Sequence, residues 1–209
     1  VFQSHYDRAL PVASLDFKLS RDEAFLEAQA FAVSQGHDLL TFESAQIFAP
    51  DMMSQIFLQK SLGLEETNRL AREWVSIFSW RVRWYKSLEK EEIHVYLDPG
   101  GRVVNYSHRI LDEDEGANLA DSSAVPIAKA FAFDTLGFSE DEWDEVERSS
   151  KEQTARTDHT FTYRKKDFVA GDAGHYRMSV VVQGDRVGSF REFVEVPESF
   201  KRSFEKTRS

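Results

Sequence analysis

The chain has 209 residues, of which 41% are hydrophobic, 13% aromatic and 30% charged, a composition typical of a folded protein and not of a disordered one. Its formal charge of −10 argues against binding of nucleic acid through the overall charge of the chain. The sequence has no cysteine, which excludes disulfides, thiolate metal sites and cysteine nucleophiles, and no apolar run long enough to span a bilayer.

The first half of the chain predicts a helix followed by antiparallel strands. Residues 15–19 alternate apolar and charged side chains, as in a short strand, and Ser20 then opens a capping box that predicts a helix to about Gln35. An extended stretch over residues 42–48 and short helices over residues 51–62 and 64–74 come next. Strands are expected over residues 80–86, 93–97 and 102–108, the last two joined by the tight turn 98–101.

The pattern restarts after the acidic segment 112–121, which we interpret as a linker. A helix is expected from Ser122 or Ser123 to about Gly137, followed by an extended stretch over residues 145–151. Strands are expected over residues 159–165, 176–182 and 186–194. Alanines recur at matching helix positions, namely Ala24, Ala28, Ala30 and Ala32 in the first half and Ala124, Ala128, Ala130 and Ala132 in the second.

This internal repeat predicts an α+β fold of two tandem units, each a helix packed on an antiparallel sheet. The expected divisions are a lead-in with a short strand (1–19), a first unit (20–111) with a helical insertion at about 49–73, the linker (112–121), a second unit (122–200) and a basic tail (201–209). The start without methionine and the basic tail favour a piece cut from a longer chain, with a processed soluble protein as the alternative.

Few groups of side chains suggest chemistry. His94 and His108 are expected on paired strands, where they could approach each other with Glu92 as a third metal ligand, although ordinary strand histidines are the stronger interpretation. Glu65 and Glu66 are interpreted as solvated carboxylates at a helix start, where the dipole favours them. We therefore expect no catalytic residue, metal site or cofactor in these 209 residues.

The most specific local feature is a pair of strands that mix aromatic and basic residues. They supply a candidate surface for an extended peptide or an anionic partner, although half-buried strands with solvent-facing cations are the stronger interpretation. The candidate residues are Trp80, Arg81, Arg83, Trp84 and Lys86 in the first strand and Phe161, Tyr163, Arg164 and Lys165 in the second.

Four segments, residues 15–24, 80–86, 95–104 and 155–161, occur in a familiar order. Together they resemble the extracytoplasmic region of bacterial membrane proteins of the CPBP family, the CAAX protease and bacteriocin-processing intramembrane metalloproteases. The repeated unit also resembles PepSY-like domains, small cystatin-like modules of a helix on a sheet that are linked to exported proteases. The family's catalytic motif, Glu-Glu-x-x-x-Arg, does not carry over, because Glu65 to Arg69 is one residue too short.

The resemblance implies a non-catalytic, extracytoplasmic regulatory or substrate-binding region, attached to an intramembrane metalloprotease whose membrane helices and catalytic residues lie outside residues 1–209. Its partners would be its own membrane domain and an extended peptide or protein substrate held by strand addition, with no nucleic acid. Two alternatives stay open. One is a free-standing exported module that binds an anionic ligand or lipid, and the other is a soluble hydrolase.

Overall fold

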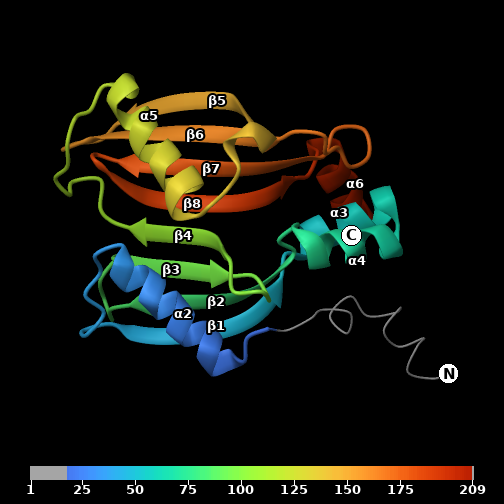
Figure 1. Ribbon diagram of the computed structural model, residues 1–209, viewed down its shortest axis with the longest axis horizontal. Helices are drawn as coiled ribbons and strands as arrows, with labels where there is room; N and C mark the ends of the chain where they lie inside the picture. Colours follow the sequence, from blue (N-terminus) through green and yellow to red (C-terminus); the bar gives the residue numbers. More distant parts are fainter. Residues whose placement is uncertain (1–17, 209) are drawn as a thin grey trace.

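Eight strands form one antiparallel sheet in the computed structural model, which describes residues 18–208 (Figure 1). The strand order is β1-β2-β3-β4-β8-β7-β6-β5, so the pairing of β4 with β8 joins the two halves of the chain into one continuous sheet. The α+β class is confirmed, whereas the arrangement as two tandem PepSY-like units stays a prediction.

The helices and strands agree closely with those predicted, and most boundaries differ by one to three residues. In the first half they are α2 (Arg21–Ser34), β1 (Glu43–Pro50), α3 (Met52–Leu62), α4 (Leu64–Glu73), β2 (Phe78–Tyr85), β3 (Glu92–Leu97) and β4 (Val103–Arg109). In the second half they are α5 (Asp121–Lys129), the π-helical turn Ala130–Thr135, the 3-10 turn Glu140–Glu142, β5 (Trp143–Glu152), β6 (Thr157–Lys165), β7 (His175–Gln183), β8 (Arg186–Glu195) and α6 (Glu198–Arg208).

Two helices cover the same face of the sheet, α2 over β2 and β3 and α5 over β6 to β8 (Figure 1). The capping box predicted for α2 is present, since Ser20 Oγ accepts from Glu23 N at 3.3 Å and Glu23 Oε2 accepts from Ser20 N at 2.8 Å. Small side chains let both helices lie close to the strands. Six of the repeated alanines are fully buried: Ala24, Ala28 and Ala32 in α2, Ala124 and Ala128 in α5, and Ala132 in the π-helical turn.

Aromatic rings fill the seam where the two halves meet. Phe31 of α2 contacts both Tyr106 of β4 and Phe131, with ring centroids 5.5 and 6.4 Å apart. Phe131 in turn contacts Phe190 of β8 at 6.0 Å. Because these rings come from both halves, the core is continuous across the β4–β8 pair.

The two ends of the described chain differ from the sequence-based expectations. The basic stretch from Lys201, expected as a tail, belongs to α6, which is held by Phe200 against Phe57 of α3 with centroids 5.0 Å apart. The expected boundary at residue 200 therefore falls inside a helix. The strand predicted over residues 15–19 lies mostly outside the described residues, and Lys18 and Leu19 are not in a strand.

The acidic segment 112–121, interpreted as a linker, is anchored to the sheet by hydrogen bonds. Arg156 is 2% exposed and its Nη1 donates to the carbonyls of Leu111 and Asp114 at 2.7 and 2.8 Å. Its Nε donates to Asp158 at 2.9 Å, which neutralises the buried guanidinium. The segment thus runs along the end of the sheet and forms one wall of a cleft.

Candidate functional site

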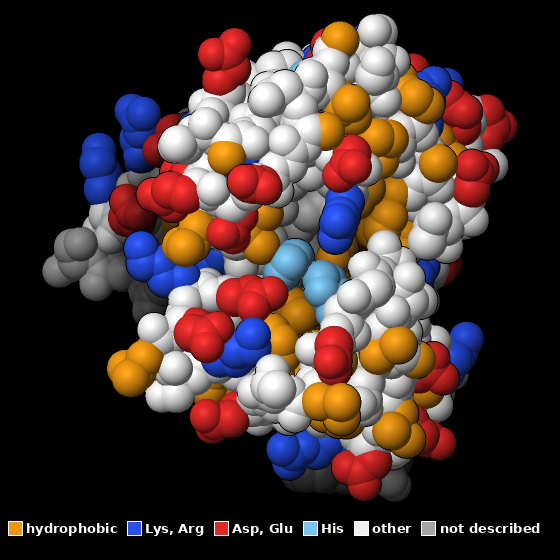
Figure 2. Space-filling model, turned by 90° about the vertical axis from the view of Figure 1, so that its left-hand side faces the viewer, with side chains coloured by type: hydrophobic (Ala, Val, Ile, Leu, Met, Phe, Trp, Pro, Cys, Tyr) orange, Lys and Arg blue, Asp and Glu red, His pale blue; other side chains and the backbone are white. Residues whose placement is uncertain are grey.

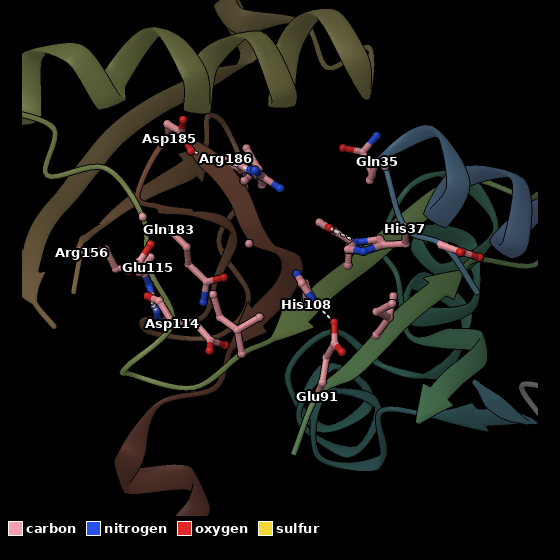
Figure 3. A pocket seen from close by; sticks show the side chains of 18 of the residues that line it. Gln35, His37, Glu91, His108, Asp114, Glu115, Arg156, Gln183, Asp185 and Arg186 are labelled. Carbon is pink, nitrogen blue, oxygen red and sulfur yellow. Dashed lines mark hydrogen bonds and ion pairs between the residues drawn. The ribbon is translucent and has the colours of Figure 1, made fainter. Parts of the chain in front are cut away.

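A cleft of about 780 Å³ opens at one end of the β4–β8 seam, between the end of α2 and the turn that joins β7 to β8 (Figures 2 and 3). Figure 2 shows it as a hollow with histidine side chains at its centre and apolar side chains around them. We call it the seam cleft. Its walls are residues 35–38 after α2, the anchored residues 114–117 and residues 183–188, and its floor includes Ile93, Tyr106, His108 and Val187.

Two histidines lie in contact on the floor of the seam cleft. Their rings meet edge to face with centroids 4.5 Å apart. His37 Nε2 lies 2.7 Å from the Tyr106 hydroxyl, and His108 Nε2 lies 2.9 Å from Glu91 Oε1. The pair is thus held from two sides, by a buried hydroxyl and by a carboxylate (Figure 3).

Burial and neighbouring charges set the protonation of these groups. Burial and the nearby charges of His108 and Arg186 lower the pKa of His37 to about 4, against a partly compensating effect of Glu91. Burial raises the pKa of Tyr106 to about 12. His37 is therefore neutral and Tyr106 is protonated at neutral pH.

The cationic side chains that line the cleft differ in how accessible they are to a ligand. Lys86 Nζ lies 3.1 Å from Glu91 and over the ring of Phe42, so it is already paired. Arg156 is buried in the wall and holds the backbone of residues 111 and 114. Arg186 is 88% exposed, and the ion pair recorded for it is a long one of 3.8 Å to Asp185. Arg186 is thus the cation of the cleft most open to a ligand.

The strands predicted as a binding surface lie far apart in the sheet. β2 is second from one edge and β6 is second from the other, so the structure does not bring them together. The aromatic residues are directed inward, since Trp84, Phe161 and Tyr163 are buried and Trp80 packs on Phe48 with centroids 4.9 Å apart. They belong to the core and present little surface to a partner.

The basic residues of these two strands divide between the faces of the sheet. Arg81 lies over the Tyr96 ring at 5.3 Å, Arg83 pairs with Glu92, and Arg164 lies opposite Arg177 on the face without α2 and α5. Lys86 lines the seam cleft. Lys165 lies between the rings of Trp74 and Trp143, at 5.2 and 5.5 Å, with its ammonium 2.6 Å from Glu142.

His94 and His108 do not approach each other, so the weaker of the two interpretations of these histidines is excluded. The register pairs His94 with Ser107 and His108 with Ile93, so the two histidines project from opposite faces of the sheet. His94 instead lies 2.9 Å from Glu92, and His108 pairs with Glu91 inside the seam cleft. Across residues 18–208, no three His, Asp or Glu side chains are placed to hold a metal ion.

The two edges of the sheet differ in how well they are protected. β1 pairs with β2 over eight residues without a register shift, and between Ser44 and Pro50 it has no charged residue. β5 contains six charged residues among Asp144–Glu152, and its register shifts between Glu145 and Glu147. Charges and bulges both discourage pairing with a further strand, so β1 is the less protected edge.

Several residues of these sites were missed from the sequence. His37 lies in a loop after α2, and no local pattern links it to Tyr106, which is distant in the chain. Arg186 is the first residue of β8, directly after a hairpin turn, where a basic residue is ordinary. The available signal for β1 was the charge-free run Ser44–Pro50 itself, which favours an edge strand open to pairing.

No protein-family model, curated protein or solved structure matches this chain. Within the part of the chain that the structure describes, no helix is long and apolar enough to cross a membrane.

Proposed function

We propose that this chain is a non-catalytic, extracytoplasmic region of a bacterial membrane protein that binds an extended segment of a partner protein by adding it as a strand beside β1. The attachment to an intramembrane metalloprotease rests on the resemblance of residues 15–24, 80–86, 95–104 and 155–161 to that family. In this role the region presents or senses a protein substrate for the membrane domain.

The single observation that carries the proposal is that β1 is the less protected of the two edges of the sheet formed by residues 18–208. β2 and β6 are each paired on both sides, so neither strand can accept a further one. Of the two edges, β5 is charged and bulged, while β1 is the terminal strand of the described sheet, pairs with β2 in a regular register and has no charged residue of its own between Ser44 and Pro50. Main-chain hydrogen bonds to such an edge give affinity for an extended peptide without requiring one sequence.

A shallow groove beside β1 supplies room for the side chains of the added strand. It has a volume of about 480 Å³ and is lined by Arg21, Asp22, Phe25 and Leu26 of α2 together with residues 44–46. Leu26 is 62% exposed, and Ile47 of β1 is 59% exposed. Alternate side chains of a bound strand would therefore meet apolar surface on both faces of the sheet.

The charge of the chain selects the kind of segment. Two copies pairing edge to edge would each bring a formal charge of −10, which opposes their association. Glu43 and Asp22 lie beside the edge, so an apolar segment with basic flanks fits better than a second copy or an acidic peptide.

We also propose that the two halves of the chain are related tandem units. In support, α2 and α5 each precede four strands, and the alanine positions that recur in their sequences are buried in both halves. The two strands that mix aromatic and basic residues, 80–86 and 159–165, lie at equivalent places in the strand order, each second from an edge. In this arrangement α3 and α4 are an insertion between the first two strands of the first unit.

The test uses a defined peptide, acetyl-Lys-Thr-Val-Thr-Val-Thr-Lys-amide, titrated into the chain while backbone amide shifts are followed by NMR. We expect shifts along β1 and its groove. The double variant Ala45→Lys with Ile47→Lys should weaken binding at least about tenfold, because edge lysines oppose strand addition. The matched control is Val146→Lys with Ser149→Lys on β5, which adds the same charge to the other edge.

Three results would contradict the proposal. They are shifts that follow β5, equal affinity for the β1 variant and the parent chain, and a concentration-dependent dimer in sedimentation that the β1 lysines abolish. The last result would assign the edge to a second copy of the chain. Thermal unfolding of each variant shows whether the fold is retained.

A further inference from the structure

We propose that the seam cleft binds the free carboxyl terminus of a peptide, with Arg186 and His37 as the donors to its carboxylate. This site is separate from the β1 edge. It lies at the β4–β8 seam in the middle of the strand order, whereas β1 is the terminal strand. Figure 1 shows these strands at their places in the sheet. Either site can therefore be occupied or inactivated without the other.

The contact between Tyr106 and His37 involves only one of the two nitrogens of the imidazole, Nε2. The Tyr106 side chain is 2% exposed, and the partner recorded for its hydroxyl is His37 Nε2 at 2.7 Å. The roles across this contact depend on the tautomer of His37, and we assign the proton of the neutral ring to Nδ1, so that the Tyr106 hydroxyl donates to Nε2. His37 thus keeps an N–H donor that Tyr106 does not use.

Arg186 supplies the charge. Its guanidinium is exposed at the cleft and has a weak ion pair at 3.8 Å with Asp185, so most of its donors are open to a ligand. The planar group can give two parallel hydrogen bonds to one carboxylate, which is the geometry that arginine favours. Its charge also contributes to the lowered pKa of His37, which places the two groups within electrostatic reach of each other.

The rest of the cleft suits the last residues of a peptide. The side chains of Gln35 and Gln183 can pair with peptide amides, and Gly36, where a Cβ would meet nothing within 4 Å, leaves open space for a ligand. Ile93 and Val187 give an apolar floor for a terminal side chain. The volume of about 780 Å³ lies within the ordinary range of ligand sites.

Acidic residues at the rim restrict the charge of the ligand. Asp38, Asp114, Glu115 and Asp185 all line the cleft. A doubly charged group such as a phosphate would meet more repulsion from them than a singly charged carboxylate. The cleft therefore favours a carboxylate on an uncharged body over an inorganic or lipid phosphate.

The experiment compares acetyl-Ala-Ala-Val with a free carboxylate against the same peptide as its amide, each titrated into the full chain by NMR. We expect the acid to shift the amides around residues 35–38 and 183–188 and to bind at least about tenfold more tightly than the amide. Arg186→Gln should remove this preference. Arg191→Gln is the matched control, because Arg191 lies on the same strand outside the cleft and stacks on Phe193.

Equal affinity for acid and amide, or an unchanged preference in Arg186→Gln, would overturn the proposal, and so would tighter binding of inorganic phosphate than of the acid. The Ala45→Lys with Ile47→Lys variant separates the two sites. It should bind the acid like the parent chain even though its β1 edge is blocked. Loss of acid binding in that variant would show that the carboxylate binds at β1 and not in the cleft.

Discussion

The ring of His37 lies edge-on to that of His108, with centroids 4.5 Å apart, and only one of the two faces a carboxylate within hydrogen-bond distance. His108 is paired with Glu91, whereas His37 is paired with the neutral hydroxyl of Tyr106. Protonation of His37 would therefore put a charge into a partly buried position beside a second histidine.

Acid should destabilise the fold through His37. Its pKa is about 4 in the folded chain against an ordinary value of 6.5, so the unfolded state binds more protons between these values and the free energy of unfolding falls as pH is lowered through this window. We expect a contribution of about 1–2 kcal/mol, reduced from the full shift because the ring is partly solvated. Urea unfolding at several pH values measures it.

The control for this effect is His37→Gln, which keeps a hydrogen-bonding group for Tyr106 but cannot be protonated. Its free energy of unfolding should fall less than that of the parent chain between about pH 6.5 and pH 4. Parallel pH profiles for the two chains would show that His37 is not the group responsible. Burial raises the pKa of Glu91, but His108 and Lys86 outweigh burial and hold this pKa below its ordinary value. Protonation of Glu91 in acid therefore also lowers the free energy of unfolding, and it does so in both chains.

Local patterns in the sequence were sufficient for the secondary structure but not for the way in which the two halves join. The alternation in β2, β3, β6 and β7 and the capping box at Ser20 identify elements because each depends on neighbours along the chain. The pairing of β4 with β8 rests on contacts such as Tyr106 with Phe190, which are far apart in sequence and leave no local signal.

The close approach of His94 and His108 that the sequence left open does not occur, for a definite physical reason. Placing two residues on paired strands does not give their faces, because a shift of one residue in register moves a side chain to the other face. In the structure Ile93, and not His94, lies opposite His108. The seam cleft was missed for a related reason, since its histidine pair needs His37 from the loop after α2.

Removing one buried hydroxyl should weaken the opposite end of the seam. Tyr176 Oη donates to Glu192 Oε2 at 2.7 Å and accepts from Ser76 N at 3.0 Å, while Arg102 pairs with the same carboxylate. Tyr176→Phe leaves both groups without this partner and should cost about 1.5–3 kcal/mol in denaturant unfolding. Tyr96→Phe, on the open face of the sheet, should change the free energy of unfolding by less than about 0.5 kcal/mol.

The same variant has a pH signature. Burial raises the pKa of Glu192 above its ordinary value of 4.5, although Arg102 opposes this, so the contribution of Glu192 to stability is full in acid and is lost as pH rises through the raised pKa. Without the hydrogen bond from Tyr176, the ionised form of Glu192 is even less favourable in the folded state. The deficit of Tyr176→Phe should therefore be larger at neutral pH than near pH 4.5, and a deficit that shrinks with rising pH would contradict this account.

Enlarging a repeated alanine should separate a helix from the sheet. Ala28 and Ala128 are both 0% exposed under their helices. Ala28→Leu and Ala128→Leu should each cost about 1–3 kcal/mol, because the added carbons have no space in a close helix-to-strand contact. Val33→Leu on the exposed face of α2 is the control and should be neutral within about 0.5 kcal/mol. A cost at only one alanine would count against equivalent packing in the two halves.

The turn between β7 and β8 should be sensitive to a single methyl group. Gly184 has φ of +64°, and a Cβ there would lie 2.8 Å from Ala117 N in the anchored acidic segment. Gly137 also has positive φ, of +75°, but a Cβ there would meet nothing within 4 Å. Gly137→Ala should therefore cost about 1 kcal/mol from backbone strain alone.

Gly184→Ala should cost more, about 2–3 kcal/mol, because the wall of the seam cleft must also move. The difference between the two variants measures how firmly residues 114–117 are held against the turn. Since Arg186 lies two residues after Gly184, displacement of this wall should also weaken binding of acetyl-Ala-Ala-Val in the cleft. If both glycine variants lost the same free energy of unfolding and the peptide bound unchanged, residues 114–117 would be shown to move easily and not to shape the site.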